Sequence, residues 1–328
     1  MDWKNNEESA SSHVRQEVSP PVSRLHGVFS HVMTPDASRL VLGTAQLGLH
    51  YGISNRTGMP SQVAATQIVR AAWEGGINTF DTAHAYGRSQ EVLGRALADI
   101  GVKDQARVVS KFPVDQPLDP DGVFNAVHDI LVILGIPCLE AMLFHRDVVV
   151  ESWDRIYDSL EALRAEGLVR SFGVSTYEPM RALAALECDG LNVLQVPGNL
   201  LDRRFDSAGF MHAAVTRGVT VYLRSVFLQG LLLMDPDALP AKVRFARDAV
   251  RRIAVAADEY GLDRDELALC YARDRWPHAK ILVGAETPEQ VRRNVEIWKR
   301  PALEKSRLQD VEKCVGEVDE RVVRPDRW

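Results

Sequence analysis

No apolar run in the sequence approaches the roughly 18 residues that a membrane-spanning helix requires. The N-terminus also lacks the basic segment followed by an apolar stretch that marks a secretory signal. The net charge is −6, and no lysine- and arginine-rich stripe with interleaved aromatic residues is present, which argues against a nucleic-acid or anionic-membrane surface. We therefore expect a cytoplasmic protein whose partner is a small molecule.

Cysteine is scarce, and its spacing excludes the common cysteine-based sites. The four cysteines, which lie far apart in the sequence, are Cys138, Cys188, Cys270 and Cys314. Cysteines paired a few residues apart, as in zinc and redox sites, are absent. We expect reduced thiols and no metal site.

From Arg39 onward, short runs of β-branched and aliphatic residues alternate with longer segments of helical period. This alternation is typical of βα units that build a parallel sheet. The predicted strands are 40–44, 77–80, 107–111, 141–145, 169–174, 193–196, 219–224 and 280–283. Eight such strands favour closure into an α/β fold of the (β/α)8 or TIM-barrel type.

Helices are predicted between these strands, and the longest gap has room for two of them. The predicted helices are 62–74, 90–100, 121–134, 153–166, 179–186, 208–216, 241–260, 263–275 and 288–299, with a covering loop at 231–240. The rival architecture is a doubly wound open sheet, which normally carries a Gly-rich dinucleotide fingerprint after its first strand. No such fingerprint follows 40–44. We predict a single barrel domain over 38–318 and a C-terminal tail over 319–328.

Residues 1–37 differ in composition from the rest of the chain. They are rich in Ser, Glu, Asn and Pro and show little periodicity. Such a segment buries too little apolar surface to offset the entropy of ordering it. We expect a flexible N-terminal extension, with the alternative that part of it, such as 25–32, caps the bottom of the barrel.

Polar side chains follow three consecutive predicted strands, at the barrel face where the C-terminal strand ends converge. The second strand ends at Asp81, with Tyr86 five positions later. The third strand ends at Lys111, and the fourth ends at His145. An acid, a phenol, an ammonium and an imidazole at one mouth form a proton-transfer device.

Each of these groups has a defined task in carbonyl reduction. Hydride addition leaves an alkoxide, and a phenol can protonate it once the phenol pKa falls from about 10 toward the working pH. We expect Lys111 to lower the pKa of Tyr86, and Asp81 to keep Lys111 charged and oriented. A neutral His145 beside the phenol can hydrogen-bond the substrate oxygen and orient it.

A longer pattern surrounds these residues. Segment 76–87 reads Gly-Ile-Asn-Thr-Phe-Asp-Thr-Ala-His-Ala-Tyr-Gly, and 91–94 reads Glu-Val-Leu-Gly. With Gly-Val-Ser at 173–175, this pattern resembles the aldo-keto reductase signature, and the resemblance runs from about residue 39 to residue 298.

The resemblance implies an NAD(P)-dependent oxidoreductase that moves a hydride between nicotinamide and an aldehyde, ketone or sugar carbonyl, or the corresponding alcohol. It assigns Tyr86 as the general acid for reduction. The implied catalytic tetrad is Asp81, Tyr86, Lys111 and His145.

The resemblance also implies a cofactor site. It places the nicotinamide carboxamide near Ser175 and Gln195, the pyrophosphate near 225–230, and the adenosine near 284–290 at a helix N-terminus, which favours an anion. Backbone amides of a Gly-containing loop can approach phosphate oxygens closely. The implied cofactor-binding residues are Gly43, Thr44, Ser175, Gln195, Arg224, Ser225, Phe227, Gln229, Gly230, Gly284, Glu286, Thr287, Gln290 and Asn294.

Four positions depart from the family pattern. Thr176 stands where members often carry Asn after the serine of the fifth strand. Arg224 stands where a tyrosine ring usually stacks on the nicotinamide; a guanidinium plane can stack as well, but it adds a charge. Gly284 and Gln290 stand where many NADP-using members carry Lys or Arg. Arg292 or Arg293 would have to supply that cation. The family pattern still favours NADP (NADPH) over NAD.

Substrate contacts are harder to predict, because pocket walls come from loops. The candidates near the mouth are His50, Tyr51, His84 and Arg146. Segments 47–52 and 224–230 look like a branch of the family associated with sugar-like substrates. Two other functions stay open: a cofactor-sensing regulatory subunit without catalysis, which the intact tetrad disfavours, and a redox-neutral enzyme that retains its nicotinamide.

Overall fold

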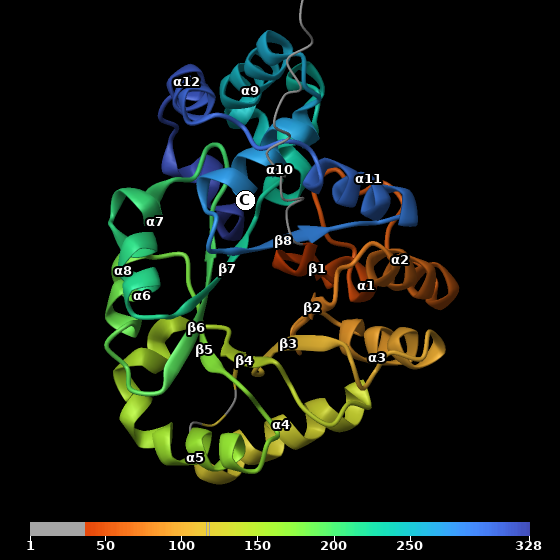
Figure 1. Cartoon of the computed structure of the whole chain (residues 1–328), viewed down its shortest axis with the longest axis vertical. Coiled ribbons are helices and arrows are strands. Elements are labelled where there is room, and N and C mark those ends of the chain that lie inside the picture. The colour runs from red at the N-terminus through yellow and green to blue at the C-terminus, as the bar shows by residue number, and fades with distance from the viewer. Residues whose placement is uncertain (1–36, 116, 118) are drawn as a thin grey trace, which may run out of the picture. The chain divides into compact units, whose positions relative to one another are not determined.

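Eight parallel strands form a closed barrel in the computed structural model, which describes residues 37–115, 117 and 119–328. The strands are β1 (Leu40–Gly43), β2 (Thr79–Asp81), β3 (Arg107–Lys111), β4 (Ala141–Phe144), β5 (Phe172–Ser175), β6 (Leu191–Pro197), β7 (Thr220–Arg224) and β8 (Lys280–Gly284). Each strand pairs with the next along the chain, and β1 pairs with β8 to close the ring. The predicted (β/α)8 barrel is confirmed, and Figure 1 shows its helices outside the strands.

The principal helices are α2 (Gln62–Glu74), α3 (Ser89–Asp99), α4 (Pro120–Leu134), α5 (Trp153–Ala165), α6 (Pro179–Ala185), α8 (Phe210–Thr216), α9 (Arg247–Tyr260), α10 (Arg264–Arg275) and α11 (Pro288–Trp298). Helix α4 illustrates why the sequence signals work. The side chain of Asp119 caps its first turn by accepting from the backbone N–H of Gly122, and Pro120 occupies the first helical position. Gly135 ends the helix in the left-handed conformation, with φ 65°.

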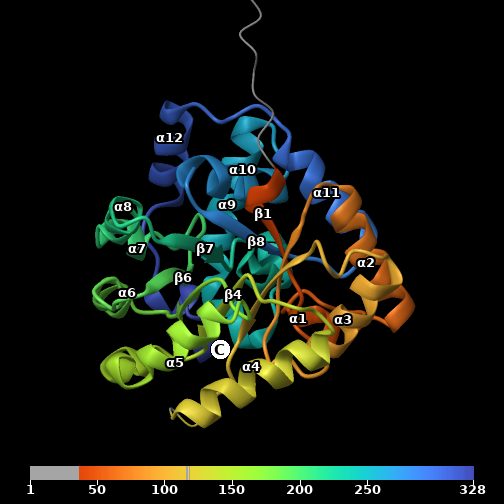
Figure 2. The same cartoon turned by 60° about the horizontal axis from the view of Figure 1, so that its bottom comes forward.

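Several elements lie outside the predicted helices and strands. They are the helices α1 (Ala45–Gly48), α7 (Arg204–Ser207) and α12 (Lys305–Val315), and the 3-10 helices η1 (Ala37–Arg39), η2 (Asp147–Ser152), η3 (Leu228–Leu233), η4 (Pro236–Ala238), η6 (Glu320–Val323) and η7 (Pro325–Arg327). The predicted helix 241–260 is divided into the 3-10 helix η5 (Ala241–Ala246) and α9. Helix α12 packs against α9, and the two lie side by side in Figures 1 and 2. Segment 319–328, set apart above as a C-terminal tail, is folded back on the protein, because Val322 and Val323 are buried in the core.

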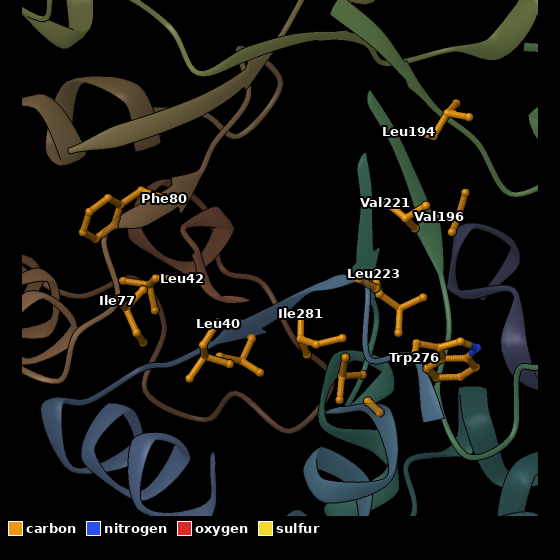
Figure 3. Close-up of a cluster of buried hydrophobic side chains, with 14 of the residues drawn as sticks. Leu40, Leu42, Ile77, Phe80, Leu194, Val196, Val221, Leu223, Trp276 and Ile281 are labelled. Carbon is orange, nitrogen blue, oxygen red and sulfur yellow. The ribbon is translucent and has the colours of Figure 1, made fainter. Parts of the chain in front are cut away.

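Side chains alternate between the two faces of the barrel wall and so build two separate cores. Leu40, Leu42 and Phe80 belong to the larger cluster, part of which Figure 3 shows, between the strands and the helices. Val41 belongs to a second cluster, and its partners there are Val109, Ala141, Leu143, Val193, Tyr222 and Leu282. Because successive strand residues point to opposite faces, this second cluster fills the barrel interior.

Residues 1–36 lie outside the described part of the chain, and with them the expected flexible extension and its alternative cap at 25–32. Ala37, the last residue of that expected extension, belongs to η1. None of the helices in the described residues is both long and apolar enough to cross a membrane.

Candidate active site

The inward-facing positions at the C-terminal ends of the strands carry the predicted site residues. Most of them lie two residues after a side chain of the interior cluster, and the others directly follow a side chain that faces the helices. Because side chains alternate along a strand, all of these residues face the barrel interior at one mouth. In strand order they are Gly43, Asp81, Lys111, His145, Ser175, Gln195, Arg224 and Gly284. Seven of these residues belong to a strand, and His145 directly follows β4. Gly43 leaves space where the other strands place side chains, whereas the side chain of Gln46 fills the space beside Gly284, where a Cβ atom would meet its Nε2 at 2.0 Å.

Asp81 and Lys111 form a buried ion pair beneath the mouth. Lys111 Nζ donates to both carboxylate oxygens of Asp81, at 2.8 and 2.9 Å, and to the carbonyl oxygen of Thr82 at 3.0 Å. The amide of Gln195 donates to Asp81 Oδ2 at 2.7 Å. Burial lowers the pKa of Lys111, and the adjacent Asp81 carboxylate opposes that shift. The carboxylate therefore keeps the ammonium charged and oriented.

Tyr86 lies above this pair because α1 and the loop after β2 approach each other very closely. A Cβ atom on Gly48 would meet the carbonyl oxygen of Tyr86 at 2.0 Å and the backbone N of Ser89 at 2.2 Å. Only glycine permits this approach. The Tyr86 ring lies with its centroid 4.9 Å from Lys111 Nζ.

The electrostatics of Tyr86 differ from the sequence-based expectation. Burial, followed by the charge of Asp81, raises the pKa of Tyr86 above its ordinary value, and Arg224 is the cation that opposes this rise. Lys111 does not lower the pKa of Tyr86 as expected, because the Asp81 carboxylate compensates the charge of the Lys111 ammonium. The phenol is consequently protonated at neutral pH.

His145 completes the group. Its ring lies edge-on to that of Tyr86, with the ring centroids 6.0 Å apart and the planes at 86°. Burial, reinforced by the charges of Lys111, Arg224 and Arg146, lowers the pKa of His145 to about 4. The imidazole is therefore neutral near pH 7, as predicted. Its buried Nδ1 has no hydrogen-bond partner within the described residues.

A cavity of about 900 Å³ runs from this group to the start of α11. Among the predicted site residues, those on its lining are Gly43, Thr44, Tyr51, Asp81, Tyr86, His145, Arg146, Ser175, Gln195, Arg224, Ser225, Phe227, Gln229, Gly230, Gly284, Glu286, Gln290 and Asn294. Four predicted residues are absent from it: Lys111 is buried against Asp81, Thr287 caps α11, and His50 and His84 are exposed. The described residues contain no group of three His, Cys, Asp or Glu placed to hold a metal ion.

The cavity suits an elongated polar molecule with a carboxamide at its inner end. The side-chain oxygen of Gln195 is buried and accepts no hydrogen bond from any described residue, so it can accept one from a ligand N–H. Ser175 lies opposite Gln195 in the β5–β6 register. A nicotinamide carboxamide supplies both the donor and the acceptor that such a pair requires.

A strained turn after β7 forms one wall of the cavity. Ser225, Leu228 and Gln229 have φ of 64°, 48° and 55°, a conformation that non-glycine residues rarely adopt. The backbone N–H of Ile53 donates to the carbonyl oxygen of Gln229 at 2.9 Å, so the loop after α1 holds this turn. Strain of this kind persists where the surrounding structure fixes it, and it is typical of ligand-binding turns.

Several lining residues were not predicted from the sequence. Tyr177, which follows β5, contacts both Arg224 and Arg324, whose guanidinium carbons lie 3.8 and 5.1 Å from the ring centroid. Arg324 and Asp326 come from the C-terminal segment, and Arg324 bonds Asp326 at 2.9 Å and Glu178 at 2.6 Å. Because the contacts of Tyr177 and Glu178 with Arg324 join residues far apart in sequence, no local pattern could have revealed them.

The comparisons with known proteins agree with this fold. Residues 39–315 match the model of the Aldo/keto reductase family. The chain belongs to that family. Its members are oxidoreductases that act on carbonyls with a nicotinamide cofactor.

Individual relatives of this aldo/keto reductase are distant. It is 26% identical over 313 residues to a pyridoxal 4-dehydrogenase of Microbacterium luteolum, covering 79% of this chain and 88% of the relative. It is 26% identical over 294 residues to an NADH-specific methylglyoxal reductase of Escherichia coli, covering 79% and 89%. A glycerol dehydrogenase structure from Gluconobacter oxydans superposes with a TM-score of 0.70 at 24% identity, over 86% of this chain and 94% of that one. The last comparison shows the shared fold.

Proposed function

We propose that this aldo/keto reductase transfers a hydride between a nicotinamide cofactor and the carbonyl of an aldehyde, ketone or sugar, with Tyr86 as the proton donor. The observation that carries the proposal is the convergence of Asp81, Lys111, Tyr86 and His145 at the inner end of one cavity. The cavity volume, about 900 Å³, is within the range of small-molecule and cofactor sites.

The cofactor, when bound, supplies the hydride. Gln195 and Ser175 would hold its carboxamide, and the strained turn from Ser225 to Gly230 would hold its pyrophosphate. The segment from Gly284 to Gln290 would hold its adenosine end. Gly43 leaves room beside this path, since a Cβ atom there would make only ordinary contacts, the nearest at 3.7 Å.

Tyr86 gives its proton to the substrate oxygen as the carbonyl carbon is reduced. Its raised pKa keeps the phenol protonated, which is the form that reduction consumes. The Lys111 ammonium, held by Asp81, stabilises the phenolate that remains. Neutral His145 orients the same substrate oxygen by a hydrogen bond.

Substrate contacts are proposed for the predicted candidates that reach the cavity. Tyr51 and Arg146 line it, whereas His50 and His84 do not. A phenol and a guanidinium at the mouth offer hydrogen-bond donors to the hydroxyl groups of a polyhydroxylated aldehyde or ketone. This arrangement supports a sugar-like carbonyl compound as the substrate class.

Turnover with a panel of aldehydes, ketones and sugars, at saturating reduced cofactor, tests the proposal. We expect oxidation of the cofactor with at least one member of the panel. The variant Tyr86→Phe should be slower by about 10²- to 10⁴-fold, the usual contribution of a positioned proton donor. Cofactor binding without turnover on any substrate would contradict the proposal and favour a regulatory subunit. Nicotinamide that survives purification and is never exchanged would favour a redox-neutral enzyme.

A further inference from the structure

The adenosine end of the cavity carries an excess of carboxylates. Asp265, at the start of α10, and Glu286, before α11, both lie on the lining. Arg293 is the one cation among the described lining residues of α10 and α11. Burial raises the pKa of Glu286, with His50 opposing the shift.

Arg293 is already neutralised by its own contacts. Its guanidinium bonds Asp265 at 3.0 Å and Asp263 at 2.7 Å, and it lies 3.4 Å from Glu266. A guanidinium held by three carboxylates has little attraction left for another anion. Arg292 does not replace it, because that side chain is exposed, pairs with Glu289 and is absent from the lining.

The start of α11 has also used its nearest donors. The side chain of Thr287 accepts from the backbone N–H of Gln290 at 3.3 Å. The side-chain oxygen of Gln290 accepts from the backbone N–H of Glu286 at 2.7 Å. These two N–H groups are therefore not free to bind a phosphate at this helix N-terminus. The Gln290 side chain thus bonds the protein's own backbone, at the position where many NADP-using members of the family carry a cation that would hold a phosphate.

We infer that Asp265, with its partner Arg293, makes this end of the cavity select NAD(H) over NADP(H). A 2′-phosphate carries close to two negative charges and would be placed beside Asp265 and Glu286 without an available cation. A 2′-hydroxyl is a hydrogen-bond donor, which a carboxylate accepts. The inference rests on the proposed function, and it argues against the NADP preference that the family resemblance implies.

The dissociation constants of NADH and NADPH, measured by calorimetry on the full chain, test this selectivity. We expect NADH to bind more tightly by at least about tenfold, the cost of placing like charges together without compensation. In Asp265→Asn, the NADPH affinity should rise by about tenfold and the NADH affinity should change much less. Glu286→Gln should shift the ratio of the NADPH and NADH affinities in the same direction. This variant leaves the contacts of α10 unchanged, because Glu286 lies before α11.

Asp263→Asn is the matched control. Asp263 also pairs with Arg293, but its side chain is 75% exposed and off the lining, whereas that of Asp265 is 26% exposed. Asn caps a helix as well as Asp, so α10 is preserved. The control should change the NADPH-to-NADH ratio less than Asp265→Asn does, because Asp265 and Glu266 still hold Arg293 and the Asp263 carboxylate lies off the lining. If the native protein bound NADPH as tightly as NADH or more tightly, the inference would be overturned while the proposed function stood. Equal changes of the ratio in Asp265→Asn and Asp263→Asn would have the same consequence. Failure to bind either cofactor would overturn the proposed function as well.

Discussion

The ammonium of Lys111 donates to both carboxylate oxygens of Asp81, and neither side chain is more than 3% exposed. Removal of either partner destabilises the fold, because the remaining charge would be buried away from water without compensation. We predict that Asp81→Asn lowers the free energy of unfolding by about 3–5 kcal/mol. Urea denaturation measures this loss.

A double-mutant cycle separates the pair from its surroundings. The double variant Asp81→Asn/Lys111→Met should lose less stability than the sum of the two single variants, since the second change removes the stranded charge. Additive losses would mean that the two charges do not compensate each other.

A second prediction concerns the pH dependence of stability at His145. Its pKa of about 4 in the folded state lies below the unfolded value near 6.5. The unfolded chain therefore binds the proton first, and the free energy of unfolding falls as the pH drops from about 6.5 to about 4, by up to about 3 kcal/mol. Urea denaturation at about pH 7 and about pH 5 measures the effect. His145→Gln should lack this component; identical pH dependence in both proteins would refute the lowered pKa.

Arg224 sets the acidity of the proposed proton donor. It is the cation that lowers the pKa of Tyr86 against burial and Asp81. In the direction of alcohol oxidation, where Tyr86 must be deprotonated, Arg224→Met should move the rising limb of the kcat/KM profile to higher pH. Arg146→Met is the control, since Arg146 acts on the pKa of His145 and not on that of Tyr86. An unmoved limb in Arg224→Met would count against this role.

The close approach of Gly48 to Tyr86 gives a fourth prediction. Gly48→Ala forces the backbone of Tyr86 to shift, because the new Cβ would lie 2.0 Å from its carbonyl oxygen. Displacement of a catalytic group by about 1 Å costs about 10²-fold in rate. We expect kcat to fall by about that factor while the protein remains folded. Gly101→Ala, where a Cβ meets no atom within 4 Å, strains the backbone at φ 73° and so lowers stability, but it should leave kcat unchanged because Gly101 lies off the cavity.

The barrel and the four convergent residues were predictable from the sequence for a physical reason. Alternation of short apolar runs with helical periods specifies βα units, and parallel strands in a barrel must bring their C-terminal ends to one face. Asp81, Lys111 and His145 mark three of those ends. Their mutual proximity then follows from topology alone.

The remaining features of the site depend on contacts between distant segments. Arg293 reads in the sequence as an available cation, and only the fold brings Asp263 and Asp265 against it. Arg324 lies in the segment that the sequence sets apart as a tail, yet it lines the cavity and contacts Tyr177. The acidity of Tyr86 was misjudged because burial outweighs the compensated charge of Lys111. No short stretch of the sequence indicates contacts of this kind.

The most direct test of the proposed chemistry follows the hydride itself. Cofactor deuterated at the transferring position of its nicotinamide is incubated with a reducible carbonyl compound, and the alcohol product is analysed by mass spectrometry. The account predicts an alcohol that carries the deuterium at the former carbonyl carbon. It also predicts that Tyr86→Phe forms this alcohol about 10²- to 10⁴-fold more slowly with unchanged cofactor affinity. An unlabelled alcohol, or equal rates for the two proteins, would contradict it.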